Sequence, residues 1–235
     1  MTLLQARGLV RSYGPTPALR GVDLEVAEGE ILAVTGPSGC GKSTLLHCLA
    51  GILRPDEGEV LYGGQRLGTL SEADRSRLRR TAFGVLFQFG QLVAELSAAE
   101  NVALPLLLAG KGRREARAAA LEWLERLDAA DVADARPGEM SGGQQQRCAA
   151  ARALVTGPKV LFADEPTGAL DALAGERLLG QLTRVAHERR TSVVLVTHDA
   201  SVAAYADREV ALRDGAVDPS GLGLDMPTTV HGGGR

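Results

Sequence analysis

The stretch ILAVTGPSGCGKSTLL, residues 31–46, decides how this chain folds. Residues 31–34 are apolar and predict a short buried strand, and the residues from Lys42 onward predict a helix. The turn between them fits the pattern G-x-x-x-x-G-K-[ST], with the strand before it and the helix after it that a phosphate-binding loop requires. The alternative is a glycine-rich turn that only caps the helix. The chain holds just three lysines, Lys42, Lys111 and Lys159, which argues against chance, so we expect a nucleoside triphosphate to bind here.

The residue types of this loop suit phosphate chemistry. Gly36, Gly39 and Gly41 let the backbone turn tightly with its N–H groups pointing inward. The helix that follows adds orphan N–H donors and the positive end of its dipole. Lys42 is placed to neutralise the β- and γ-phosphates, and the Ser43 hydroxyl can ligate Mg²⁺. The nucleotide-binding residues predicted from the loop are Gly36, Pro37, Ser38, Gly39, Cys40, Gly41, Lys42, Ser43 and Thr44.

Length and composition narrow the class of protein. A chain of 235 residues fits one large α/β domain or two small ones. The net charge of −3 gives no reason to expect a nucleic-acid partner. Cys40, Cys48 and Cys148 show no metal-ligand spacing, and reduced thiols are the simplest interpretation; Cys40 is either a redox handle or a tolerated small side chain. We find no signal-peptide pattern and no window of roughly 18 uncharged apolar residues, so work at a membrane would need another polypeptide that crosses it.

Strands and helices alternate along the chain, which predicts an α/β fold with a parallel sheet. Residues 90–154 are mainly helical and predict a subdomain inserted between β-rich segments. We interpret the charge of the Arg-rich helix at 71–80 as a solvated face. Because the residues beyond 217 have little to bury, we expect one domain over 1–217 and a disordered tail over 218–235. The expected strands are 3–10, 22–26, 58–64, 83–87, 160–163, 191–197, 209–212 and 216–217; the expected helices are 42–51, 71–80, 98–108, 113–127, 141–155, 175–188 and 200–206.

A second possible anion site opens the helix at residues 141–155, within the sequence MSGGQQQR at 140–147. Ser141 is a natural N-cap, and Gly142 and Gly143 expose backbone N–H groups at the helix N-terminus. This site is independent of the phosphate-binding loop. The alternative interpretation is a well-capped helix with no ligand.

Polar side chains follow three predicted buried strands. Asp164 and Glu165 end the apolar run at 160–163, and two adjacent carboxylates at the edge of a core need a reason because unpaired buried charge is costly. Asp164 can hold Mg²⁺ through its water shell, and Glu165 is placed to polarise a water as general base. Gln88 and His198 follow the strands at 83–87 and 191–197. Ligands of open α/β sheets bind at the carboxyl ends of the strands, so we expect these groups to converge on the phosphates held by Lys42.

In this order, the motifs resemble the ATP-binding subunit of ABC transporters, over roughly residues 2–217. The resemblance implies a P-loop NTPase with a RecA-like core of mainly parallel sheet, an N-terminal antiparallel β subdomain and an inserted α-helical subdomain. It also implies an active ATPase that uses ATP and Mg²⁺. The implied metal site consists of Ser43, Gln88 and Asp164, and the implied catalytic residues are Glu165, His198 as the γ-phosphate switch, and Gln88, which reaches Mg²⁺ and the attacking water.

The resemblance also gives roles to residues away from those strand ends. The family signature falls at residues 141–145, with Met140 where leucine is usual. Asp171 matches a contact between subunits, and Tyr13 falls where an aromatic ring stacks on adenine; by itself, a tyrosine in a turn is more often a packing residue. The further nucleotide-binding residues implied are Tyr13, Ser141, Gly142, Gly143, Gln144 and Asp171.

The partners are expected from the resemblance alone. Two copies would pair head to tail in an ATP-dependent homodimer, each ATP lying between one phosphate-binding loop and the other copy's signature helix. The segments 83–92 and 100–108 are similar to the lipoprotein-release and macrolide-export subfamily. We therefore expect integral-membrane permease subunits, export of lipoprotein, antibiotic or antimicrobial peptide, and a cytoplasmic location at the inner face of the cell membrane. The alternatives are a transmembrane signalling complex controlling a wall hydrolase, and a soluble ATPase of DNA repair or translation.

Overall fold

The computed structural model describes residues 1–88 and 91–218 of the chain. Its centre is a six-stranded sheet in the order β10-β9-β3-β8-β7-β6. The strands from β9 to β6 run parallel to their neighbours, and β10 pairs antiparallel with β9 in a hairpin. Their bounds are β3 Ile31–Thr35, β6 Phe83–Leu86, β7 Val160–Asp164, β8 Ser192–Val196, β9 Arg208–Arg213 and β10 Ala216–Val217.

A second sheet forms the N-terminal part of the fold. It is four-stranded and antiparallel, in the order β2-β1-β4-β5. The strands are β1 Thr2–Tyr13, β2 Thr16–Ala27, β4 Glu57–Tyr62 and β5 Gln65–Arg66. β1 and β2 are longer than the expected strands, because register shifts in their pairing accommodate residues that break the alternation of apolar side chains. Tyr13 therefore ends β1, opposite Thr16, and does not lie in the turn.

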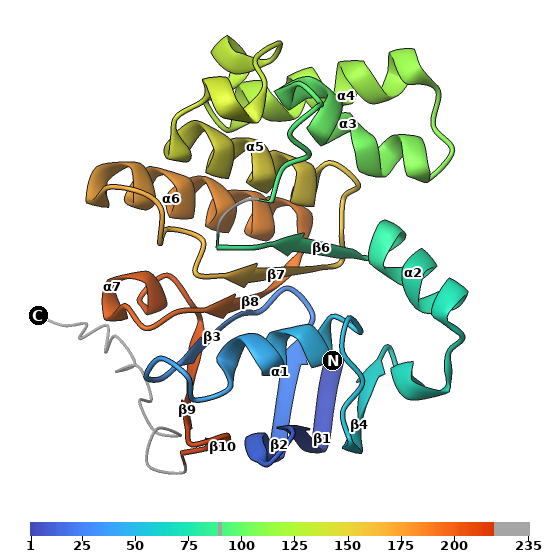
Figure 1. The fold of residues 1–235 in the computed structure, drawn as a ribbon, viewed down its shortest axis with the longest axis vertical. Helices are drawn as coiled ribbons and strands as arrows, with labels where there is room; N and C mark the ends of the chain where they lie inside the picture. The colour runs from blue at the N-terminus through green and yellow to red at the C-terminus, as the bar shows by residue number, and fades with distance from the viewer. Residues whose placement is uncertain (89–90, 219–235) are drawn as a thin grey trace, which may run out of the picture.

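Helices cover both faces of the parallel sheet (Figure 1). The helices are α1 Lys42–Leu49, α2 Glu72–Thr81, α3 Ala98–Leu108, α4 Arg113–Arg126, α5 Gly142–Leu154, α6 Ala172–Arg189 and α7 Ala200–Ala203, with short 3-10 turns η1 Leu67–Thr69, η2 Ala130–Val132 and η3 Pro137–Glu139. Across the described ranges, no helix is both long enough and apolar enough to cross a membrane.

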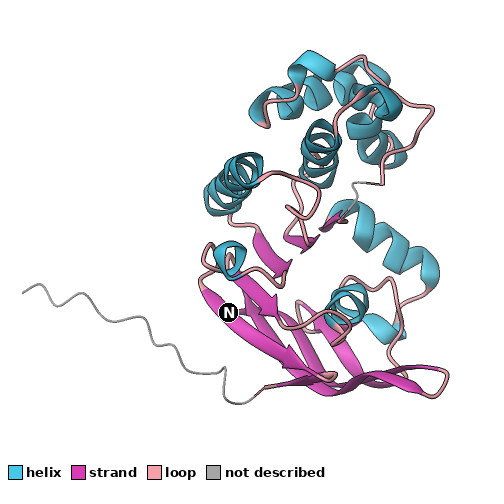
Figure 2. Ribbon diagram, turned by 60° about the vertical axis from the view of Figure 1, so that its left-hand side comes forward, coloured by secondary structure: helices cyan, strands magenta, loops and turns pink. Residues whose placement is uncertain are grey.

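The two faces of the sheet belong to different hydrophobic cores. Phe162 and Val194 point into a core shared with α1 and the antiparallel sheet. Leu161 and Val193, their neighbours along the same strands, point into a core shared with α3, α4, α5 and α6. All residues of β7 and β8 are buried, as expected for strands covered on both faces. Figure 2 shows the sheet between these layers.

Three expectations about the helices are wrong. α7 ends at Ala203, three residues before the expected end at residue 206, because the chain turns there toward β9, which begins at Arg208. α6 begins at Ala172, three residues before the expected start, because the Asp171 side chain accepts a hydrogen bond from the Ala174 N–H at 2.8 Å and caps the helix. The Arg-rich helix α2 is capped by Ser71, but its charge is not all solvated: Arg75 is only 7% exposed. The expected tail begins with Asp218, whose N–H donates to the Ala211 carbonyl at 2.8 Å; the remainder, 219–235, lies outside the described residues.

Candidate active site

The loop at residues 36–41 joins the central strand β3 to α1. Lys42 is buried, and its ammonium donates to the Gly36 and Pro37 carbonyl oxygens at 2.7 and 2.9 Å. The Lys42 ammonium group is therefore held against the loop, where it can meet an anion bound to the loop. Ser43, the next residue of α1, is exposed.

The glycines of the loop are required by its packing as well as by its shape. A Cβ on Gly36 would lie 2.1 Å from the Leu212 carbonyl oxygen of β9, and one on Gly41 would lie 2.2 Å from the Ala18 oxygen of β2. Gly39 has a positive φ of 80° but open space around it. The motif gives all three glycines the same importance. In the structure, only Gly36 and Gly41 lie against the backbone of strands from distant parts of the chain.

Asp164 ends β7 next to this loop. Burial raises the pKa of Asp164 above its ordinary value, while the hydrogen bond from Ser43, nearby His47 and Lys42 act in the opposite direction. The carboxylate is 9% exposed, and within the described ranges its Oδ1 atom has no hydrogen-bond partner. A buried carboxylate oxygen left unpaired is costly unless a ligand completes it.

Glu165 and His198 meet at the ends of β7 and β8. The Glu165 Oε1 atom lies 2.6 Å from His198 Nδ1, and its Oε2 atom accepts from the Thr197 hydroxyl at 3.3 Å. Glu165 has a φ of 45°, a left-handed conformation that is uncommon for a residue with a side chain and is concentrated at functional sites. In this structure His198 therefore orients the glutamate, a contact that the sequence analysis did not foresee.

Gln88 reaches the same region from the end of β6. A Cβ placed on Gly168 would lie 3.1 Å from Gln88 Nε2, so the amide lies against the loop that follows Glu165. The Gln146 amide of α5 donates to the Phe87 carbonyl at 3.2 Å, which fixes the backbone beside Gln88 to the helical layer. The groups predicted to converge, Gln88, Asp164, Glu165 and His198, thus lie at the carboxyl ends of adjacent strands.

The start of α5 forms a second group. Ser141 caps the helix as predicted, and it does so in a capping box: its hydroxyl accepts from the Gln144 N–H at 3.2 Å, and the Gln144 Oε1 atom accepts from the Ser141 N–H at 2.9 Å. Gly142 and Gly143 pack against the loop before Asp171, since Cβ atoms on them would lie 3.5 Å from Ala169 and 3.3 Å from Leu170. Ser141 and Gly142 are exposed.

These two groups are not joined within the chain. Among the residues that the structure describes, no hydrogen bond or ion pair links residues 141–144 to residues 36–44.

Tyr13 lies apart from the strand ends, on the hairpin of β1 and β2. Its ring is half exposed, and the Arg11 guanidinium lies 5.3 Å from the ring centroid. Asp56 holds Arg11 at 2.6 Å and accepts from the Ser12 N–H at 2.7 Å, so the backbone before Tyr13 is fixed. Further along β2, Ala18 touches Gly41 of the loop. The stacking role of Tyr13 stays a prediction.

The donors present suit Mg²⁺. Ser43 and Asp164 would offer hard oxygen ligands, and within the described ranges the Asp164 Oδ1 atom has no hydrogen-bond partner. In the described part of the chain, no three His, Cys, Asp or Glu side chains form a metal-binding group.

Sequence reasoning missed two residues of the site. Thr197 donates to Glu165 and also accepts from the Asp199 N–H at 3.1 Å, so it fixes both the glutamate and the turn that carries His198. Its position between a buried strand and His198 was a usable signal. His47 lies on α1 near Asp164, with its ring 6.0 Å from that of Phe87. Nothing in its sequence neighbourhood indicated that contact.

Comparison with known proteins decides the family. A sequence model described as ABC transporter matches residues 19–168, which is more than half of the chain. The chain belongs to the ABC transporter family. It is 47% identical, over 92% of its length and 96% of the relative's, to the lipoprotein-releasing system ATP-binding protein LolD 2 of Caulobacter vibrioides. It is 44% identical, over 92% of its length and 98% of the relative's, to the corresponding LolD protein of Geobacter metallireducens.

Solved structures of ABC cassettes agree with this fold. The dimeric structure of MJ0796, a bacterial ABC transporter cassette, matches with a TM-score of 0.88 at 38% identity, covering 92% of this chain and 97% of that one. A post-hydrolysis state of MJ0796 bound to ADP and Pi matches with a TM-score of 0.87 at 37% identity, with the same coverage. The expected P-loop NTPase fold and the resemblance to the lipoprotein-release subfamily are confirmed. As an ABC cassette the chain is an ATPase that uses ATP and Mg²⁺.

Proposed function

We propose that this chain is the ATPase subunit of a lipoprotein-releasing ABC transporter and that it powers a separate membrane permease. The observation that carries the proposal is the cluster of Lys42, Asp164, Glu165 and His198 at the carboxyl ends of β3, β7 and β8. The likeness to LolD proteins over 92% of the chain supports lipoprotein as the cargo class.

The side chains of the cluster divide the work of hydrolysis. Lys42 and the loop N–H groups hold the β- and γ-phosphates, and Ser43 and Asp164 hold Mg²⁺, which neutralises charge on the phosphates when bound. Glu165 accepts the proton of the attacking water, and Gln88 orients that water. The 2.6 Å contact with Glu165 and the bond from Thr197 keep the carboxylate in place. His198 leaves this contact to meet the γ-phosphate when the site closes.

Two copies complete two sites. Ser141 and Gly142 are exposed, and no described contact brings the start of α5 to the phosphate-binding loop of its own chain. Leu173, next to the Asp171 cap, is a large apolar side chain that is 58% exposed, and the proposed interface would cover it. The dimeric structure of MJ0796 supports the same arrangement here.

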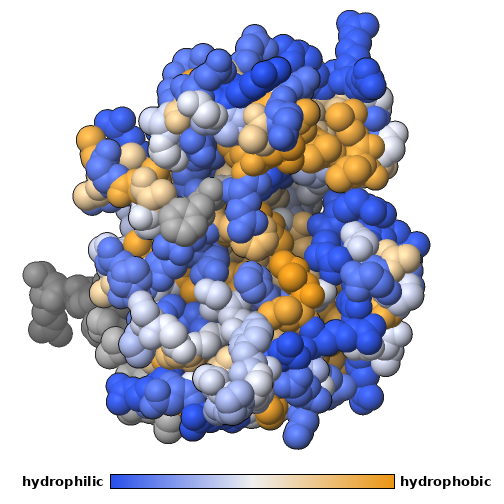
Figure 3. Space-filling model, viewed as in Figure 1, coloured by the Kyte–Doolittle hydropathy of each residue, from blue (hydrophilic) through white to orange (hydrophobic). Residues whose placement is uncertain are grey.

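The permease would dock in a groove between α2 and α3. This pocket, about 380 Å³, is lined by Arg79 and Arg80 of α2, by Phe87 beside Gln88, and by Pro105 and Leu108 of α3. Leu108 is 62% exposed, and Figure 3 shows apolar surface over α3 beside the polar surface of α2. A partner seated there lies directly against the segment that carries Gln88, which gives it a path to the site.

Co-purification with the permease tests the proposal. Leu108→Glu places a charge in the groove and should abolish binding of the cassette to membranes that carry the separately encoded permease, with basal ATPase unchanged. Leu121→Glu, on α4 at 38% exposure and outside the groove lining, is the matched control and should bind normally. Normal binding by Leu108→Glu would contradict the docking surface. Lipoprotein release from reconstituted vesicles that needs ATP distinguishes transport from signalling, since a signalling complex would show turnover without release.

A further inference from the structure

A second pocket, of about 220 Å³, lies on α2 away from the active site. The C-terminal end of α1, the turn at residues 53–55, β4, η1 and Arg75 of α2 form its walls, and no residue of the candidate active site lines it. Leu53, Val60 and Leu67 make an apolar surface. The charged lining consists of three arginines, Arg54, Arg66 and Arg75, and one glutamate, Glu59.

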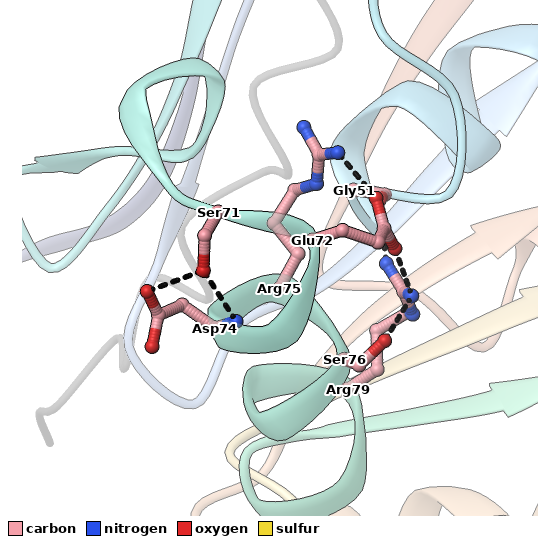
Figure 4. Close-up of polar contacts among 7 residues, drawn as sticks. All are labelled: Gly51, Ser71, Glu72, Asp74, Arg75, Ser76 and Arg79. Carbon is pink, nitrogen blue, oxygen red and sulfur yellow. Dashed lines mark hydrogen bonds and ion pairs between the residues drawn. The ribbon is translucent and has the colours of Figure 1, made fainter.

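Arg75 and Arg79 share one carboxylate but are satisfied differently (Figure 4). Both donate to Glu72. Arg79 also donates to the Gly51 carbonyl at 2.7 Å and to the Ser76 hydroxyl at 2.9 Å. Arg75 is more than nine-tenths buried, and its Nε and Nη1 atoms are fully covered. Even so, these two atoms have no hydrogen-bond partner among the described residues. A guanidinium carries five N–H donors, so three of them are left without an acceptor.

Among the described residues that line the pocket, none accepts a hydrogen bond from those Arg75 donors. Glu59, the acidic residue of the lining, forms an ion pair with Arg66, whose Nε atom lies 2.8 Å from Glu59 Oε2. Buried charged donors that lack acceptors are costly, and an ionised acceptor is the strongest remedy. The excess of arginine in the lining favours a negative charge, and the apolar walls favour a carbon chain attached to it.

The geometry points to a regulatory site for a small organic anion, with a carboxylate or phosphate monoester on Arg75 and a short apolar chain against Leu53, Val60 and Leu67. This site goes beyond ATP hydrolysis and permease docking. The Nε and Nη1 atoms of Arg75 are covered in this structure, so the guanidinium turns toward the pocket to meet the anion and gives up its contact with Glu72. That carboxylate is then left to Arg79, which also lines the permease groove. Occupancy of the anion site is thereby linked to the permease groove through the Glu72 side chain.

The test follows the Arg75 Nε–Hε signal in the ¹⁵N-labelled full chain, assigned by its loss in Arg75→Lys. Acetate, butyrate, hexanoate and the matching alkyl phosphates are titrated. We expect saturable shifts of this signal, with an affinity that rises about fourfold for each methylene buried. The stronger of the two series identifies the anionic group.

Matched variants locate the effect. Arg75→Met should lose the chain-length-dependent binding, whereas Arg77→Met, on the same helix but exposed and paired with Asp74 at 2.7 Å, should keep it. An Arg75 signal that does not move with any of these anions overturns the site, as does binding that is equally strong for acetate and hexanoate. The titration uses the unaltered protein, so the proposal stays falsifiable if Arg75→Met fails to fold.

Discussion

Gly41 illustrates how closely the phosphate-binding loop is packed. It has a φ of 106°, and the carbonyl of Ala18 occupies the place where a side chain would begin. Gly39, two residues earlier, has a φ of 80° but no neighbour within reach. The motif alone gives both residues the same status, because a sequence pattern records which residue type is present and not which neighbour excludes the others.

Gly41→Ala should destabilise the protein much more than Gly39→Ala. Alanine at Gly39 bears only the left-handed backbone strain, about 1–2 kcal/mol. Alanine at Gly41 has similar backbone strain. In addition, its Cβ atom would lie 2.2 Å from the Ala18 carbonyl oxygen, which cannot move away without shifting β2. Urea unfolding midpoints measure the difference, and equal losses for the two variants would show that the loop is not wedged against β2.

Asp164→Asn should stabilise the nucleotide-free protein at neutral pH. Burial raises the pKa of Asp164 above its ordinary value of 3.8, so between these two values the folded state holds a proton that the unfolded state has lost. The free energy of unfolding contributed by this group therefore falls as pH rises through that window and stays low above it. The neutral amide removes this penalty, and the advantage of the variant disappears below the ordinary pKa.

Thermal unfolding across the pH range, with and without Mg-ATP, measures this effect. Mg-ATP should stabilise the parent protein but not Asp164→Asn. Asp56→Asn is a control with the opposite sign, because the Ser12 N–H and the Arg11 ion pair lower the pKa of Asp56. Asp56→Asn should therefore destabilise the folded protein at neutral pH, and its effect on the free energy of unfolding should shrink as pH falls. An Asp164→Asn protein less stable than the parent at neutral pH would contradict the prediction.

Among the elements, the start of α5 combines a capping box with an exposed helix end. The capping box of Ser141 and Gln144 satisfies N–H groups at the end of the helix, yet the same end remains exposed. α3 begins with the same device, in which Ser97 and Glu100 cap each other, at a place outside the candidate site. The two helices therefore separate the structural role of a cap from a ligand-binding role.

Ser141→Ala and Ser97→Ala should each lower the free energy of unfolding by about 1 kcal/mol, the usual cost of losing an N-cap side chain. Only Ser141→Ala should also weaken ATP-dependent pairing of the cassettes, because only that helix end is proposed to meet the γ-phosphate. Chemical denaturation and sedimentation with ATP measure the two effects. If Ser97→Ala impaired pairing as much, the loss would reflect general stability.

The elements also show where sequence reading succeeds. The apolar runs of β7 and β8 are long enough to identify strands buried on both faces, and the polar residues that end them mark the site. The start of α6 was misplaced because Asp171 was interpreted only as an interface residue, although Asp is also a strong N-cap. The burial of Arg75 could not be read at all, since it depends on how α2 packs on α1 and η1, far from any local pattern.

For the whole molecule, the proposed cycle requires two chains. In this cycle each exposed α5 start would meet the phosphate-binding loop of a second copy, so the γ-phosphate would join the copies and its cleavage would release them. The TM-score of 0.88 to a dimeric cassette shows that this chain has a shape found in such a pair.

Glu165→Gln should bind ATP, lose turnover and remain dimeric. The amide keeps the shape of the side chain but cannot accept a proton, and loss of a general base costs typically 10²–10⁴-fold in rate. Phosphate release measures turnover, and size-exclusion chromatography with saturating ATP measures pairing. Finding only monomer under those conditions would refute the proposed cycle, while Glu176→Gln, an exposed glutamate on α6, should behave like the parent.

The hairpin of β9 and β10 has a consequence for the way the protein is made. Leu212 closes over Gly36, and the Gly215 N–H donates to the Cys40 carbonyl at 3.0 Å. A ribosome finishes the complete G-x-x-x-x-G-K-S motif early in synthesis, yet two of the walls that shape it emerge only near residue 215. During translation the nascent chain therefore carries the nucleotide motif before the residues of β9 and the following turn that contact the loop have been made.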